Sequence, residues 1–149
     1  MTFLNELDAD LRDRVRATLR EAESTNPNMS YLEAHDWLEQ IAPAYGVPFN
    51  QTDDREFEEA LIWPLVKYRD KGTRAIMAVD QWYLPYRDKG VTQEMTAKLM
   101  KVSVRLIKEA TKLLDECYYD LAVEVILRER TMKSAAQWVR DNPRLRTGV

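Results

Sequence analysis

The chain has 149 residues, of which 45% are hydrophobic and 32% are charged, the composition of a folded globular protein rather than a disordered or fibrous one. One cysteine and one histidine exclude a disulfide scaffold and a zinc site built from Cys and His ligands. Four glycines and six prolines are too few turn residues for an all-β sandwich, and the longest apolar run, residues 60–66, is too short to cross a membrane.

The formal charge of −3 is unevenly distributed along the chain. Residues 1–63 hold 14 acidic and 5 basic residues, whereas residues 98–149 hold 7 acidic and 11 basic residues. We therefore divide the chain into an acidic N-terminal part, 1–72, and a basic C-terminal part, 73–149, within one compact unit. This division predicts two surfaces with different partners, although helical surfaces also carry charged patches without any partner.

Apolar residues recur every three or four positions almost throughout, which predicts an all-α fold of six to seven helices. The apolar residues of the first helix repeat over residues 3–19 after a possible cap at Thr2, and residues 24–28 end the helix. The next begins at Ser30, which forms a capping box with Glu33, and it ends before Gly46.

Carboxylates at residues 53–59 occupy the first turns of a third helix, where they suit the positive end of the helix dipole. Pro64 either kinks this helix or starts a new one, because proline lacks the amide that a helix interior needs. Gly72 is the predicted C-terminal cap. A fourth helix covers residues 73–83, and Pro85 marks its end or a kink.

One pentapeptide occurs twice: Tyr-Arg-Asp-Lys-Gly stands at residues 68–72 and again at 86–90. The simpler interpretation is two helix ends that share a basic last turn followed by glycine. The alternative is a pair of basic corners that contact phosphates.

Residues 91–142 contain no proline and no glycine. The apolar spacing predicts either one long helix from Ser103 or two helices separated at residues 115–120. A last helix begins near Thr131 or at Ser134, which could form a capping box with Gln137, and it ends before Pro143.

Residues 92–108, TQEMTAKLMKVSVRLIK, predict two helices joined by a tight turn. Thr92 can cap the first helix, and the small Ala97 lets the two helices approach. Val102 closes the turn and Ser103 can cap the second helix. From Thr92 to about Glu116 the chain resembles the helix-turn-helix of bacterial DNA-binding proteins, especially the promoter-reading domain of sigma factors.

Two positions depart from that family's pattern. Lys101 stands where glycine is usual, so a left-handed backbone there costs about 1 kcal/mol. Thr96 stands where a branched apolar residue is usual. The resemblance implies a second helix that enters DNA and acts in a dimer, since such modules read paired half-sites.

The residues expected to contact DNA are those on the exposed side of the second helix. Arginine can reach guanine with two hydrogen bonds, and lysine and serine suit phosphates. The predicted set is Ser103, Val104, Arg105, Lys108, Glu109 and Lys112.

The sequence thus predicts a small non-enzymatic DNA-binding regulator that is cytoplasmic, needs no cofactor or metal and has no membrane contact. The alternative is a helical inhibitor or adaptor that docks a protein partner through acidic residues. That acidic set is Asp53, Asp54, Glu56 and Glu59. An enzyme is the third possibility; His35 is interpreted as a packed or surface histidine and Cys117 as a small buried apolar residue.

Overall fold

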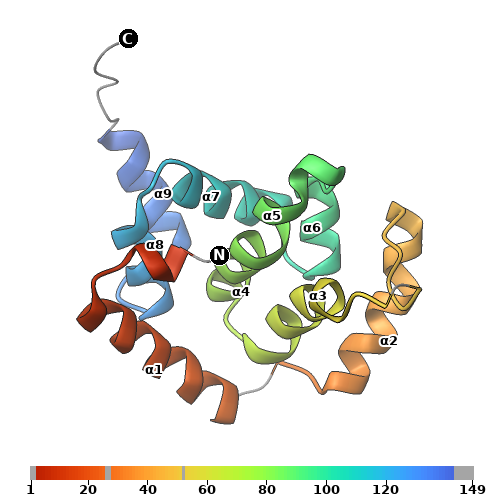
Figure 1. Ribbon diagram of the computed structural model, residues 1–149. Helices are drawn as coiled ribbons and strands as arrows, with labels where there is room; N and C mark the ends of the chain where they lie inside the picture. Colours follow the sequence, from red (N-terminus) through yellow and green to blue (C-terminus); the bar gives the residue numbers. More distant parts are fainter. Residues whose placement is uncertain (1–2, 26–27, 52, 143–149) are drawn as a thin grey trace.

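The computed structural model describes residues 3–25, 28–51 and 53–142, and every regular element in these ranges is a helix (Figure 1). The all-α prediction is therefore confirmed. The predicted number of helices was too low, because this part of the chain holds eight α-helices of at least seven residues. The α-helices are α1 (Ala9–Thr25), α2 (Tyr31–Ile41), α3 (Arg55–Lys67), α4 (Lys71–Ala78), the three-residue α5 (Leu84–Tyr86), α6 (Gln93–Leu99), α7 (Val104–Asp115), α8 (Tyr119–Ile126) and α9 (Met132–Asp141).

The remaining helical elements are short and irregular. Three are 3₁₀ turns: η1 (Phe3–Glu6), η2 (Ala42–Tyr45) and η4 (Arg87–Lys89). The π-helix η3 (Val79–Tyr83) continues directly from α4 into α5. Within the described ranges, no helix is both long and apolar enough to span a bilayer.

The first predicted helix is divided in two. The Asp8 carboxylate accepts a hydrogen bond from the amide of Leu11 at 2.9 Å, so the first α-helix begins at Ala9 instead of near residue 3. Phe3 and Leu4 form the separate turn η1 and are buried. The predicted cap, Thr2, lies outside the described residues.

Local chemistry sets the ends of α2 as the sequence indicates. The hydroxyl of Ser30 accepts a hydrogen bond from the amide of Glu33 at 3.1 Å. After α2, the turn η2 ends at Gly46, whose φ of 73° is the left-handed conformation that favours glycine. Both predicted boundaries are confirmed.

Pro64 lies inside α3 and does not start a new helix, so the second of the two predicted alternatives is wrong. The helix continues to Lys67. Its last turn is held by Asn28, whose backbone amide donates to the carbonyl of Val66 and whose side chain donates to that of Leu65, both at 2.8 Å. A distant residue therefore satisfies the carbonyls at this helix end.

Pro85 lies just after the point where the π-helix η3 is followed by the α-helical turn α5. The amide of Leu84 donates to the carbonyl of Val79, five residues earlier, which is the spacing of a π-helix. Pro85 follows in the three-residue α5 and has no amide to continue the pattern. The predicted irregularity is present, but the helix passes through Pro85 instead of ending there.

The repeated pentapeptide begins one helix and ends another. Asp70 accepts hydrogen bonds from the amide and hydroxyl of Thr73 at 2.9 and 3.0 Å, so α4 starts at Lys71. Gly72 therefore lies inside α4, and its predicted role as a C-terminal cap is wrong. The second copy does end a helix, at Gly90 with a φ of 98°. Identical residues thus take opposite roles because different neighbours surround them.

The two glycines of this repeat should respond differently to alanine. At Gly90 an added Cβ meets nothing within 4 Å, so Gly90→Ala should cost about 1 kcal/mol from the left-handed backbone alone. At Gly72 the added Cβ would lie 3.1 Å from Cγ1 of Val125 in α8.

Denaturant unfolding in a double-mutant cycle with Val125→Ala tests this difference. We expect favourable coupling between Gly72→Ala and Val125→Ala, since the second change removes the close contact, and additive effects for Gly90→Ala and Val125→Ala. Additivity at both glycines would contradict the close approach of α4 and α8.

The C-terminal region contains separate helices rather than one long one. The chain leaves α7 through Cys117, which has a φ of 60°, before α8 begins. Cys117 is exposed, so the prediction of a buried cysteine is wrong; it stands on a turn and not on a helix face.

Thr131 caps α9 by accepting a hydrogen bond from the amide of Ser134 at 3.0 Å. The helix therefore begins at the first of the two predicted positions, and this cap replaces the expected capping box from Ser134 to Gln137.

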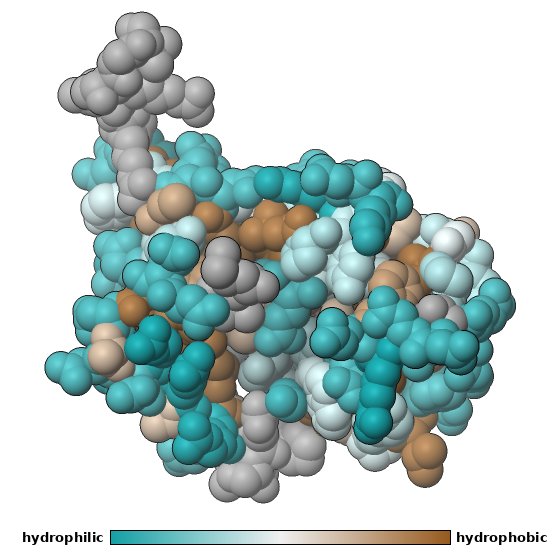
Figure 2. Space-filling model, viewed as in Figure 1, coloured by the Kyte–Doolittle hydropathy of each residue, from teal (hydrophilic) through white to brown (hydrophobic). Residues whose placement is uncertain are grey.

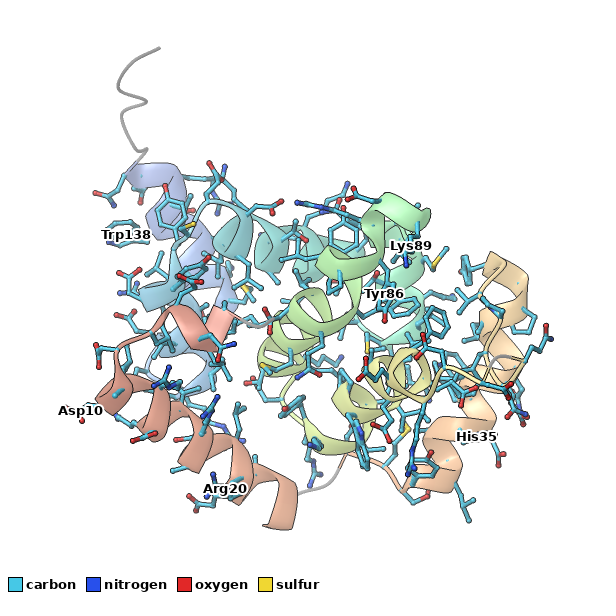
Figure 3. All side chains as sticks on the ribbon, in the orientation of Figure 1. Asp10, Arg20, His35, Tyr86, Lys89 and Trp138 are labelled. Atoms are coloured by element: carbon cyan, nitrogen blue, oxygen red, sulfur yellow. The ribbon has the colours of Figure 1, made fainter. Side chains whose placement is uncertain are left out.

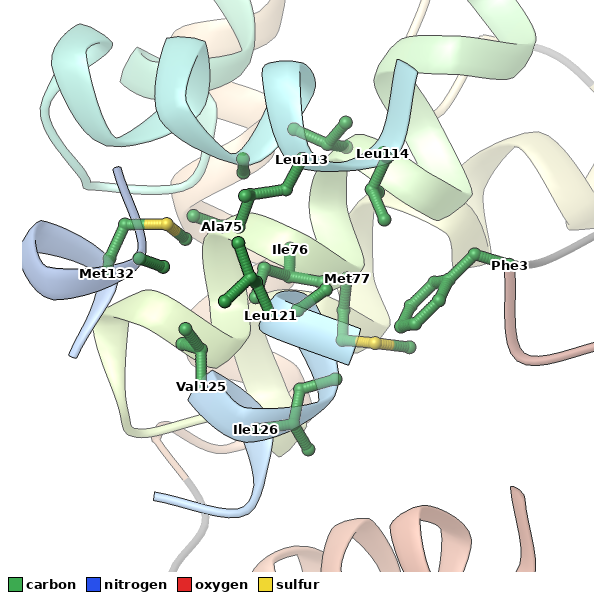
Figure 4. Close-up of a cluster of buried hydrophobic side chains, with 14 of the residues drawn as sticks. Phe3, Ala75, Ile76, Met77, Leu113, Leu114, Leu121, Val125, Ile126 and Met132 are labelled. Atoms are coloured by element: carbon green, nitrogen blue, oxygen red, sulfur yellow. The ribbon is translucent and has the colours of Figure 1, made fainter. Parts of the chain in front are cut away.

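Two apolar clusters share the long helical segment formed by α4 and η3. In the first, Phe3 and residues of α1 pack with α4, α7, α8 and α9. Figure 4 shows Phe3 together with the side chains that α4, α7, α8 and α9 contribute. In the second, α2, α3 and α6 surround Trp82 of η3. The N-terminal η1 and α1 thus pack against C-terminal helices, while α2 and α3 lie on the opposite side of the ribbon from α8 and α9 (Figure 1).

Candidate nucleic-acid interface

The segment singled out by the sequence begins with a capped short helix. The hydroxyl of Thr92 accepts from the amide of Met95 at 3.1 Å and starts α6. Thr96 is fully buried, and its hydroxyl donates to the carbonyl of Thr92 at 2.8 Å. That hydrogen bond satisfies a polar group at a position where an apolar residue was expected.

The turn after α6 places Lys101 in the left-handed conformation, with a φ of 56°. The amide of Val102 donates to the carbonyl of Ala97 at 3.0 Å and closes the turn. The ammonium of Lys101 lies 4.4 Å from the ring centroid of Trp37, and Trp37 Nε1 donates to the carbonyl of Leu99 at 2.9 Å. A cation–π contact of this kind offsets part of the backbone cost.

The second helix, α7, has one buried and one exposed face. It begins after Ser103, whose hydroxyl accepts from the amide of Leu106 at 3.2 Å. Its exposed cations are Arg105, Lys108 and Lys112. Its buried residues are Ile107, Ala110, Thr111, Leu113 and Leu114. The structure therefore places the three predicted cations on the side that faces away from the core.

Neighbouring carboxylates partly neutralise this face. Arg105 Nε lies 2.9 Å from Glu109 Oε1, and Lys112 Nζ lies 3.8 Å from Glu116 Oε2, each one helical turn apart. Glu109 is thus a partner of Arg105 as well as a predicted contact. Lys108 has no ion pair within 4 Å among the residues that the structure describes.

A shallow groove runs between α7 and α9. Its floor is apolar, and its rim adds a cation from α9 to those of α7. The floor contains Leu113, Ala136 and Val139, and the rim contains Val104, Arg105, Lys108, Glu109, Lys112 and Arg140. Sequence reasoning missed Arg140, because no local pattern indicates that α9 packs beside α7. Figure 2 shows one face of the whole molecule, on which hydrophilic side chains cover most of the surface and apolar ones are visible between them.

The acidic residues proposed for a protein partner lie at the start of α3. Asp54 accepts from the amide of Phe57 at 3.1 Å as the helix cap, and Glu59 pairs with Arg55 at 3.0 Å. Asp53 and Glu56 are exposed. Two of the four acidic residues, Asp54 and Glu59, therefore already have partners within α3 or at its start.

His35 belongs to α2 (Figure 3) and packs against the loop that follows η2, so the prediction of a packed or surface histidine is confirmed. Its ring centroid lies 5.2 Å from that of Phe49, and its Nδ1 lies 3.7 Å from Glu39 Oε2. Together with Asp36 these groups come close enough to share a cation. All three potential ligands belong to one helix and both carboxylates are exposed, so we assign no metal site to these residues.

Comparison with models of protein families, with curated proteins and with solved structures finds no match. A functional assignment for this chain therefore depends on its own residues and their geometry.

Proposed function

We propose that this protein is a non-enzymatic DNA-binding regulator that inserts α7 into the major groove. The observation that carries the proposal is the arrangement of α7: it follows a tight, capped turn and exposes Arg105, Lys108 and Lys112 on one side. The opposite side is anchored in the core by Ile107 and its buried neighbours. This division leaves the cations available to nucleic acid while the core holds the helix in place.

The roles follow from position along the helix. Arg105, in the first turn, is the candidate for reading guanine, and its pairing with Glu109 at 2.9 Å orients the guanidinium. Lys108 and Lys112 are candidates for phosphate contacts, which provide affinity without sequence preference. Arg140 lines the same groove from α9 and adds positive charge beside them.

A DNA-binding titration at several salt concentrations tests these roles. Arg105→Ala should weaken specific binding by about 1–3 kcal/mol if the arginine reads a base. Lys108→Ala and Lys112→Ala should each weaken binding to all sequences alike and lower the salt slope by about one unit. Arg55→Ala removes an exposed cation on α3 and serves as the matched control, expected to leave binding unchanged.

Absence of salt-dependent binding by the wild-type chain would overturn the proposal, and so would an equal loss in Arg55→Ala. The second candidate, docking of a basic protein partner through the acidic residues, would then lead. Exposed apolar side chains on α2 favour it, since Leu32 is 74% exposed and Tyr31 is 46% exposed next to the acidic α3.

A further inference from the structure

A second hollow, separate from the face of α7, lies where the loop after η2 meets the start of α3 and the segment from α5 to α6. Its volume is about 270 Å³, just below the range of about 300–1,000 Å³ typical of drug-sized ligands. The glycines at its edge, Gly46 and Gly90, have open space where a side chain would stand. The hollow is therefore suited to a small molecule.

Two aromatic rings, Phe57 and Tyr86, border this pocket, and the fully buried ring of Trp82 packs behind them. The ring centroid of Phe57 lies 5.1 Å from that of Trp82 and 5.3 Å from that of Tyr86, with nearly perpendicular ring planes. Trp82 and Tyr86 are 5.0 Å apart. Because each ring packs on the other two, the wall is held in place before any ligand arrives. Aromatic faces attract cations through their negative π clouds.

The charges around this wall also favour a cation. Asp54 lines the pocket, and the negative charge of Glu56 acts on the phenol of Tyr86. Burial raises the pKa of the Tyr86 phenol, and the charges of Asp54 and Glu56 raise it further. Tyr86 already has a cation over its ring, since the ammonium of Lys89 lies 5.7 Å from the ring centroid. The two residues lie close together in Figure 3.

We propose that the pocket walled by Phe57 and Tyr86, backed by the buried Trp82 and bordered by Asp54, binds a small organic ammonium ion. Lys89 is an exposed, flexible side chain and acts as the resident cation that the ligand displaces from Tyr86. This binding site does not depend on the DNA-binding proposal, because α7 contributes no residue to the pocket.

Titration calorimetry of the full chain with choline chloride tests the proposal, with 3,3-dimethyl-1-butanol as the neutral molecule of the same shape. We expect saturable binding of choline and much weaker binding of the alcohol. Tyr86→Leu should weaken choline binding roughly two- to fivefold, whereas Tyr86→Phe should retain it because the ring remains.

Two charge variants sharpen the test. Asp54→Asn should weaken choline binding while preserving the cap of α3, since asparagine caps helices as well as aspartate does. Lys89→Met should tighten it roughly two- to fivefold, because the competing cation is removed. The proposal is overturned by equal binding of choline and the alcohol, by weaker binding in Lys89→Met, or by no saturation on the order of tens of millimolar in both wild type and Lys89→Met.

Discussion

Replacing Ile107 by alanine is expected to lower the free energy of unfolding by about 2–5 kcal/mol, the range for truncating a buried isoleucine. Ile107 is fully buried and belongs to the cluster that joins α7 to α4 and α8. The change removes apolar contacts and leaves a cavity that the surrounding helices fill only in part. The neighbouring Lys108 is exposed, so Lys108→Ala should change stability by no more than about 0.5 kcal/mol.

Urea unfolding of the two variants, followed by tryptophan fluorescence and by circular dichroism, measures this difference. These adjacent positions of α7 should differ several-fold in their effect because Ile107 is buried and Lys108 is exposed. Equal, small effects at both positions would contradict the placement of α7 and remove the basis for assigning its cations to a free face.

A second large effect is expected at Asp80, a carboxylate inside the π-helix η3. It is 4% exposed, and its Oδ1 accepts from the amide of Phe3 at 2.9 Å, while Oδ2 has no hydrogen-bond partner within the described part of the chain. Burial raises the pKa of Asp80 from 3.8 to about 6, and the hydrogen bond from Phe3 opposes part of that rise.

The sign of the pH dependence follows from proton binding. Between about pH 4 and about pH 6 the folded chain holds the Asp80 proton more strongly than the unfolded chain, so stability decreases as pH rises through this window. The loss from this group amounts to about 3 kcal/mol and is complete above the folded pKa. Asp80→Asn should abolish it, because the amide oxygen can still accept from Phe3 but carries no charge.

Unfolding free energies of wild type and Asp80→Asn, measured from pH 4 to pH 7, provide the test. Other groups titrate in both proteins, so the informative quantity is the difference between the two curves, which should change by about 3 kcal/mol across the window. Parallel curves would show that Asp80 is not buried as an ionisable group.

The sequence by itself determined the helical class and several helix ends. Ser30, Thr92 and Ser103 each cap a helix by bonding to an amide three residues later. Such a bond depends on the residue and its immediate neighbours, so it can be recognised without knowing the fold. The same reasoning placed Arg105, Lys108 and Lys112 on one face of α7, because a helix has a fixed repeat.

Tertiary structure contributed to the boundaries that the sequence predicted wrongly. The helix α3 continues past Pro64 to Lys67, and Asn28, far away in the sequence, satisfies the carbonyls of Leu65 and Val66 in its last turn. Gly72 lies in the first turn of α4, where an added Cβ would lie 3.1 Å from Cγ1 of Val125 in α8, whereas Gly90 in an identical pentapeptide ends a helix. The five residues are the same at both sites, so the difference comes from the residues that follow them, Thr73 in one copy and Val91 in the other, and from the helices packed around them.

The grouping of helices around the two clusters was equally inaccessible from the sequence. Arg140 reaches the groove beside α7 because α9 packs there, and Phe57, Trp82 and Tyr86 meet because α3 lies against η3 and α5. Periodicity indicates which face of each helix is buried, but it does not identify the partner helix, since any apolar stripe can cover any other. The partner is selected by how all the side chains fit together at once, which is a property of the whole chain.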